Sequence, residues 1–138
     1  MKGQYLTIEY VLFFAIGIAL VVGIYTTFNS INAGIREDSG IVQFEKLGES
    51  IRGSIVKIYE YGIITDSTIE YKLKIPTKIS GGMYLIKYDN LLNVNSTENY
   101  KIGTTLDVYN INIRPSNIIY STKGEINIKY NEGWVELS

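Results

Sequence analysis

The pattern of hydrophobic and polar residues begins with a long apolar run. From Tyr10 to Ile35 no residue carries a charge, and the part from Val11 to Tyr25 is almost wholly aliphatic or aromatic. As a helix this run would extend roughly 39 Å, more than the roughly 30 Å of a bilayer's hydrocarbon core. Because no polar face recurs every 3.6 residues, only lipid or a bundle of similar helices could cover it. We predict a membrane helix over residues 4–40; a cleaved secretory signal is the alternative, although its apolar core is usually shorter.

The next region, residues 41–61, has an amphipathic pattern. Apolar residues recur there at spacings of three and four, with charged residues between them: Phe44, Leu47, Ile51, Ile55 and Ile58. This spacing predicts a helix with one apolar face. Gly48 and Gly53 weaken it, each by up to about 1 kcal/mol relative to alanine, so we expect a kinked continuation of the membrane helix. Its apolar face needs a sheet to bury it.

Residues 62–138 change to a period of two, which is typical of strands with one face in water. We predict strands at 69–75, 83–88, 106–113, 118–120, 125–130 and 134–137. The last two form a hairpin around Asn131-Glu132-Gly133, and turn residues separate the others. Short strands joined by turns favour antiparallel pairing. The predicted fold class is α+β, a long N-terminal helix followed by a small antiparallel β-sheet or β-sandwich domain on which residues 41–61 pack.

Charge balance and missing residue types narrow the function. The net charge is -1, from 13 basic and 14 acidic residues, whereas nucleic-acid binders concentrate positive charge, so we expect no nucleic-acid partner. With no His and no Cys, imidazole bases, thiol nucleophiles and thiolate metal sites are excluded. The acidic residues lack the dense spacing of a calcium loop. We expect no catalytic, cofactor-binding or metal-binding residues and therefore no enzyme.

Small residues recur every fourth position within the apolar run. Ala15, Ala19, Gly23 and Thr27 drift only about 40° per step around a helix. Small side chains let helices approach closely in lipid, where packing drives association. The stripe is therefore a candidate helix-packing surface; the alternative is that Ala and Gly are simply common in membrane helices.

The residues before the apolar run form a short motif. Lys2, Gly3 and Gln4 are followed by Glu9, which stands directly ahead of the apolar helix. This motif resembles the class III signal of archaeal type IV pilins and archaellins. The resemblance implies cleavage of residues 1–3 by a prepilin peptidase, with the cut between Gly3 and Gln4 and the helix retained.

Glu9 is the most informative residue of this motif, because a carboxylate at the edge of a membrane segment is costly without water or a cationic partner. In pilins the partner is the freed amine of a neighbouring subunit, which here would be the amine of Gln4. Counted from Gln4, Glu9 is the sixth residue, whereas the family usually has Glu at the fifth. The alternative for Glu9 is a carboxylate at headgroup level, favoured by the helix dipole alone.

Two features of the β region extend the comparison. The run from Tyr71 to Tyr88 looks like the first hairpin of many archaeal pilin-like domains. Asn95-Ser96-Thr97 is an N-glycosylation sequon, which we expect in an exposed polar turn. Asn95 is thus a candidate glycosylation site on a domain outside the cytoplasm.

Two functional hypotheses remain. In the first, the chain is a pilin-like subunit of an archaeal surface filament, and its helix packs against copies of itself or related pilins after leader cleavage. In the second, the helix anchors a β-sandwich binding module that never polymerises and that contacts a surface layer, an adhesion target or an archaellum motor. Both place the chain in the membrane or at the cell surface.

Overall fold

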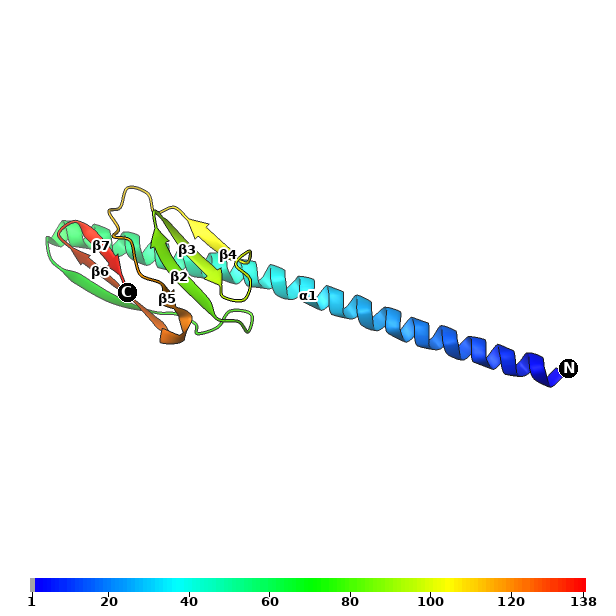
Figure 1. Ribbon diagram of the computed structural model, residues 1–138. Coiled ribbons are helices and arrows are strands. Elements are labelled where there is room, and N and C mark those ends of the chain that lie inside the picture. Colours follow the sequence, from blue (N-terminus) through cyan, green and yellow to red (C-terminus); the bar gives the residue numbers. More distant parts are fainter. Residues whose placement is uncertain (1) are drawn as a thin grey trace. The chain divides into compact units, whose positions relative to one another are not determined.

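The computed structural model describes residues 2–138, and its elements follow the predicted order of one long helix and then strands (Figure 1). The helix is α1, Lys2–Thr65. The strands and one short 3-10 helix are β1 Ile69–Lys74, β2 Tyr84–Asp89, β3 Leu91–Ser96, β4 Gly103–Leu106, β5 Ile119–Tyr120, η1 Ser121–Lys123, β6 Glu125–Asn131 and β7 Trp134–Leu137. The chain divides after Arg36 into two compact units. The predicted α+β class, a long apolar helix followed by small antiparallel sheets, is confirmed.

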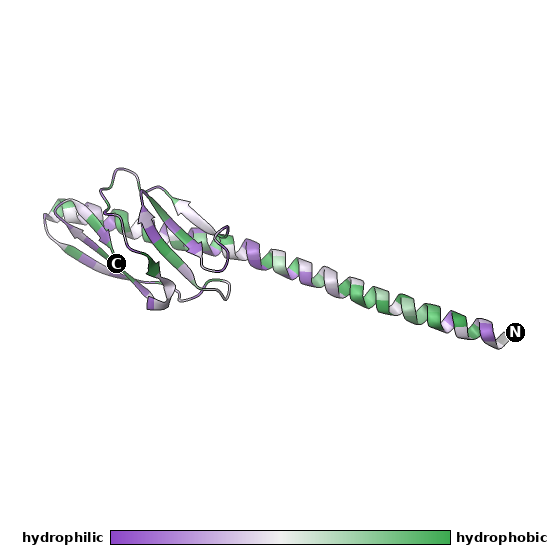
Figure 2. Ribbon diagram, in the orientation of Figure 1, coloured by the Kyte–Doolittle hydropathy of each residue, from purple (hydrophilic) through white to green (hydrophobic). Residues whose placement is uncertain are grey.

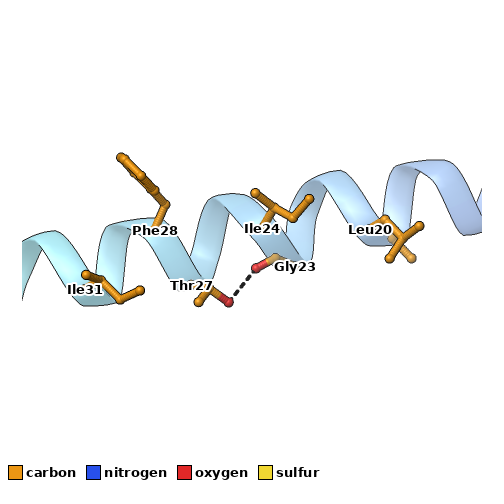
Figure 3. Close-up of a pocket in the computed structure, with 7 residues that line it drawn as sticks. Leu20, Gly23, Ile24, Thr27, Phe28 and Ile31 are labelled. Atoms are coloured by element: carbon orange, nitrogen blue, oxygen red, sulfur yellow. Dashed lines mark hydrogen bonds between the residues drawn. The ribbon is translucent and has the colours of Figure 1, made fainter.

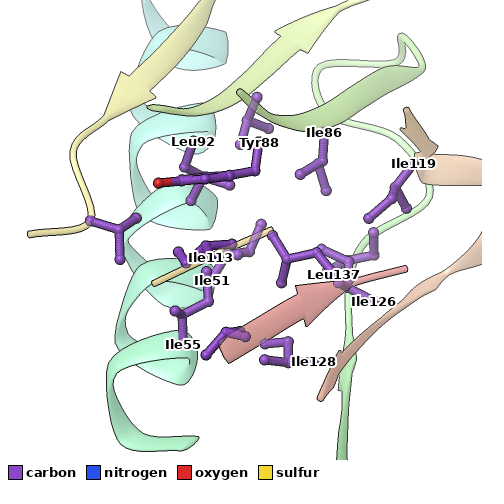
Figure 4. Close-up of a cluster of buried hydrophobic side chains, with 14 of the residues drawn as sticks. Ile51, Ile55, Ile86, Tyr88, Leu92, Ile113, Ile119, Ile126, Ile128 and Leu137 are labelled. Atoms are coloured by element: carbon purple, nitrogen blue, oxygen red, sulfur yellow. The ribbon is translucent and has the colours of Figure 1, made fainter. Parts of the chain in front are cut away.

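The second unit holds two antiparallel sheets. One has the strand order β1-β6-β7 and the other the order β4-β3-β2-β5. Successive residues along each strand point to opposite faces of the sheet. In β6, Ile126, Ile128 and Tyr130 are buried while the residues between them are more exposed. The buried faces of both sheets contribute to one hydrophobic core (Figure 4).

The part of α1 in this unit completes that core, as its amphipathic pattern predicted. Phe44, Ile51, Ile55 and Ile58 are buried, and Leu47 packs against them while partly exposed. Figure 4 shows Ile51 and Ile55 pointing from the helix toward side chains of the strands. Phe44 meets Tyr84 of β2 edge-on, with ring centroids 5.8 Å apart. The strands therefore supply the apolar surface that this helical face requires.

The helix ends later than the change of pattern at Gly62 suggested. It continues through Gly62 to Thr65, and Gly48 and Gly53 do not interrupt its helical assignment. Gly62 has a packing role, because a Cβ atom there would overlap the ring of Tyr130. Gly48 has a similar one, since a Cβ atom would lie 2.7 Å from Thr104 Cγ2. These glycines let strands approach the helix closely, a benefit that their low helix propensity does not reveal.

The predicted C-terminal hairpin is confirmed. Asn131 pairs with Trp134, and the two residues between them, Glu132 and Gly133, have φ values of 47° and 84°. Two positive φ values are the mark of the type I′ turn, whose twist matches that of antiparallel strands.

Two strand predictions are wrong. Leu91–Ser96 forms β3, where no strand was predicted and Asn95 was expected in a turn; Leu92 and Val94 alternate into the core. The strand expected over 106–113 is instead β4 ending at Leu106 and then irregular chain, in which Ile113 makes a single bridge to Val135. In both segments local composition predicted the wrong secondary structure. The burial of a few side chains determined which residues form strands.

The hairpin expected between Tyr71 and Tyr88 is also wrong. β1 pairs with β6, whereas β2 pairs with β3 and β5. The intervening segment forms only a tight local bridge between Ile79 and Gly82. Alternation specifies which face of a strand is buried, but it does not specify the neighbouring strand.

Candidate membrane-anchoring helix

The first unit is an apolar helix with exposed sides. Every side chain described from residue 3 to residue 36 is exposed, including Phe14 at 71 % and Val21 at 67 %. Figure 2 shows this stretch coloured mostly as hydrophobic. Within residues 2–138, α1 is the one helix long and apolar enough to cross a membrane, with a mean hydropathy of 2.3 over its best 18-residue window. Such a helix is compatible with membrane anchoring, and a signal sequence has the same properties.

Three of the four stripe residues line one shallow hollow on this helix. Ala19, Gly23 and Thr27 form it together with the neighbouring larger side chains of Leu20, Ile24, Phe28 and Ile31 (Figure 3). Ala15 is not among the lining residues. A Cβ atom added at Gly23 would meet nothing within 4 Å, so the backbone is accessible at that point. Small residues of this kind allow another helix to approach closely in an apolar medium.

A second hollow was not predicted. Gly17 lies between Phe13, Phe14, Ile18, Val21 and Val22, which line it. Its glycine falls outside the four-residue repeat that defined the predicted stripe. The signal that could have found it is a small residue flanked by large ones at spacings of three and four.

Three threonine side chains of this helix bond to its own backbone. Thr26 and Thr27 each donate a hydrogen bond to the carbonyl of Gly23, with oxygen–oxygen distances of 2.9 and 2.8 Å. Thr7 donates in the same way to the carbonyl of Gly3, at 2.9 Å. A hydroxyl satisfied in this manner costs little in an apolar medium. These threonines therefore do not prevent the helix from lying in lipid.

The motif residues lie in the first turns of α1. Lys2, Gly3 and Gln4 are all helical, and the exposed Glu9 follows about one and a half turns later. Among the ion pairs within residues 2–138, none includes Glu9. The structure thus leaves this carboxylate accessible at the start of the apolar run. The role of these four residues in cleavage and assembly stays a prediction.

Asn95 lies in strand β3, where we expected an exposed turn. It is partly buried and pairs with Leu85 on one side and Gly103 on the other. Thr97, the last residue of the sequon, donates its hydroxyl to the carbonyl of Met83 at 2.9 Å. Gly103 is required opposite Asn95, because a Cβ atom there would overlap the Asn95 side chain. Glycosylation of Asn95 stays a prediction, with its acceptor held in a sheet.

The second unit offers buried polar chemistry only as structural support. Tyr84 donates its hydroxyl to the carbonyl of Pro76, and burial raises the pKa of Tyr84 to about 12. Burial and the nearby carboxylate of Asp107 raise the pKa of Tyr88. In residues 2–138 no three His, Cys, Asp or Glu residues are grouped to hold a metal ion. The exposed apolar helix is therefore the main candidate functional feature.

Comparison of the chain with protein-family models, curated proteins and solved structures finds no match.

Proposed function

We propose that the chain is a type IV pilin-like structural subunit of an archaeal surface filament. A prepilin peptidase removes residues 1–3, the apolar helix first lies in the membrane, and it then packs with copies of itself or related pilins. The observation that carries this proposal is the exposed apolar surface of α1 up to Ile35, beside the short motif of Gly3, Gln4 and Glu9.

Energetics support the need for a partner around this helix. Burying one large apolar side chain contributes about 1.5–3 kcal/mol, and the helix exposes more than a dozen of them to solvent in the isolated chain. No strand covers these side chains among residues 2–138, because the strands contribute to the core of the second unit. Lipid covers them in a membrane, and neighbouring helices cover them in a filament.

The hollows give this packing a specific geometry. A neighbouring helix can place a large side chain against Gly23 and approach closely there. The larger side chains Leu20 and Phe28 then flank the contact. In an apolar medium such close packing, together with satisfied hydroxyls, supplies most of the association energy.

Glu9 supports the same proposal through its position. The residue is exposed at the start of the apolar run, where transfer into lipid or a helix bundle would remove its carboxylate from water. The amine that cleavage would create at Gln4 of a neighbouring subunit is a matching cation. This pair would both neutralise the charge and set the stagger between subunits.

Processing and assembly are tested separately. N-terminal sequencing of the membrane-extracted chain should begin at Gln4, and an intact Met1 would contradict the pilin proposal. Filaments sheared from cells should contain the chain. If the chain is cleaved but remains wholly with the membrane fraction, the anchored binding module becomes the better interpretation.

The variant Glu9→Gln tests the charge at constant size. We expect normal cleavage and loss of the chain from sheared filaments, because the amide cannot neutralise a neighbouring amine. Glu45→Gln is the matched control, since Glu45 is an exposed carboxylate of α1 in the second unit. Equal filament yields from the two variants would remove Glu9 from the assembly mechanism.

A further inference from the structure

Strand β1 is an unpaired edge of its sheet. The strand order β1-β6-β7 leaves one side of β1 without a neighbouring strand among residues 2–138. Glu70, Tyr71, Lys72 and Lys74 are exposed, and Tyr71 keeps 45 % of its surface although it lies opposite the buried Ile128. An open edge can accept another strand through backbone hydrogen bonds.

The backbone groups that face this open edge can be identified. The amide of Ile75 donates to the carbonyl of Gly124 at 2.9 Å, continuing the register of β1 on β6. Successive residues of a strand direct their backbone groups to opposite sides. The odd-numbered residues of β1 therefore bond to β6, and the amides and carbonyls of Glu70, Lys72 and Lys74 face outward.

We propose that this edge pairs with β1 of a second copy of the chain, antiparallel and centred on Tyr71. In this register Glu70 lies opposite Lys72 of the second copy, and Lys72 lies opposite its Glu70. On the other face Ile69 lies opposite Leu73, and the two Tyr71 side chains meet. Both faces are thus complementary, and a two-fold axis makes the interface identical on the two copies.

Neighbouring registers are worse. A shift of two residues in one direction places Glu70 opposite Glu70. The same shift in the other direction places Lys72 opposite Lys72, although Glu70 then lies opposite Lys74. Like charges directly opposite each other destabilise a strand pair. A shift of one residue moves apolar side chains to the charged face. Of these three registers of the charged face, the one centred on Tyr71 is therefore the one that places no like charges opposite each other.

The contacts that Glu70 and Lys72 make within the chain are too weak to prevent pairing with a second copy. Lys72 Nζ is 3.8 Å from Glu125 Oε1, and both side chains are about half exposed or more, so this ion pair contributes little. Asn127 Nδ2 donates to Glu70 Oε1 at 2.7 Å, which leaves the second carboxylate oxygen of Glu70 available. Both charges can therefore interact with a second copy.

The proposed pairing also determines the relative direction of the helical segments of the two copies. A Cβ atom at Gly62 would meet Tyr130, the partner of Ile69, and one at Gly40 would lie 3.2 Å from Ser80 Oγ. The chain from Ile69 toward Ser80 thus runs opposite to residues 40–62 of α1. Antiparallel pairing of two β1 strands makes these helical segments of the two copies run in opposite directions.

Cysteine cross-linking of the full chain in detergent tests the register, because the native sequence contains no Cys. In the proposed pair the Tyr71 positions are opposite each other without mutual hydrogen bonds, where Cα atoms are about 4.5 Å apart, within disulfide range. Tyr71→Cys should oxidise to a covalent dimer in most of the chain. Tyr109→Cys, at a loop residue that is 70 % exposed, is the control and should give little dimer. Equal yields from the two would overturn the proposal.

Charge variants in the Tyr71→Cys background test the chemistry. Glu70→Lys and Lys72→Glu each place like charges opposite each other and should lower the dimer yield several-fold, whereas the double exchange should restore it. Equal yields from the single and double variants would overturn the pairing. Because this experiment depends on neither cleavage nor filaments, its failure would leave the proposed function untouched.

Discussion

The two parts of α1 differ in what can bury their apolar side chains. In residues 44–58 a stripe of apolar residues lies on one face, and the strands bury Ile51 and Ile55 completely. In residues 3–36 the apolar residues surround the helix, and every described side chain is exposed. The apolar side chains of the later segment are thus buried by strands of the same chain, whereas those of the earlier segment need lipid or other helices to bury them.

This difference shows why the apolar periodicity of a helix is informative about its environment. A stripe predicts a protein neighbour on one side and water on the other. An apolar surface all round predicts a medium without water, which is lipid or a bundle. The function proposed for the chain follows from the second segment, and its stability as a folded domain follows from the first.

Removal of the first segment should give the largest effect. A chain that begins at Glu37 retains the hydrophobic core and should enter the aqueous phase of a detergent partition, whereas the full chain should enter the detergent phase. The reason is the exposed apolar surface of residues 3–36. Circular dichroism of the truncated chain checks that it remains folded. A full chain that enters the aqueous phase would contradict the proposed difference between the two segments of α1.

A matched pair of substitutions tests the buried and exposed segments directly. Ile51→Ala removes methyl groups from a fully buried site and should lower the free energy of unfolding of the second unit by about 2–5 kcal/mol. Ile24→Ala makes the same change at a side chain that is 68 % exposed and should leave that free energy unchanged. Thermal or denaturant unfolding in detergent measures both. Equal losses would show that residue 24 also packs on the folded domain.

Much of this division was predictable from the sequence because it depends on the spacing of apolar residues. The apolar run, the stripe from Phe44 to Ile58 and the alternation in β1 and β6 are all local patterns, and the structure contains the predicted elements. The type I′ turn at Glu132 and Gly133 was also locally specified.

The remainder depended on contacts between distant residues. The sequon at Asn95 was expected in a turn, but burial of Leu92 and Val94 placed it in β3. The pairing of β1 with β6 joins residues far apart in sequence and carries no local signal. At the candidate site the small residues were predictable, but the second hollow around Gly17 required the positions of its large neighbours.

Glycines on the two parts of the helix should respond differently to alanine. Gly62→Ala introduces a methyl group where the Tyr130 ring lies and should destabilise the second unit by about 1–3 kcal/mol despite the gain in helix propensity. Gly53→Ala lies in open space on the same segment and should stabilise it by up to about 1 kcal/mol. Gly17→Ala should not change unfolding of the second unit. Stabilisation by Gly62→Ala would show that Tyr130 moves aside without cost.

Tyrosines provide the smallest contrast. Tyr84 is fully buried and donates to the Pro76 carbonyl, so Tyr84→Phe should cost about 1 kcal/mol at pH 8 by leaving that carbonyl without its donor. Tyr25→Phe removes a hydroxyl from a side chain that is 67 % exposed and should not alter unfolding of the second unit. Thermal unfolding of both variants beside the native chain measures this difference.

The pH dependence of unfolding adds a second test of the buried Tyr84 hydroxyl. The pKa of Tyr84 is about 12 in the folded chain, whereas the phenol of the unfolded chain ionises near pH 10. The folded state therefore holds this proton more tightly, and the resulting stability is complete below pH 10 and is lost as the pH rises toward 12. Since Tyr84→Phe has no proton to lose, the stability advantage of the native chain over this variant should shrink above pH 10 and then reverse. A constant gap from pH 8 to pH 12 would mean that the hydroxyl ionises equally well in both states and that water reaches this part of the core.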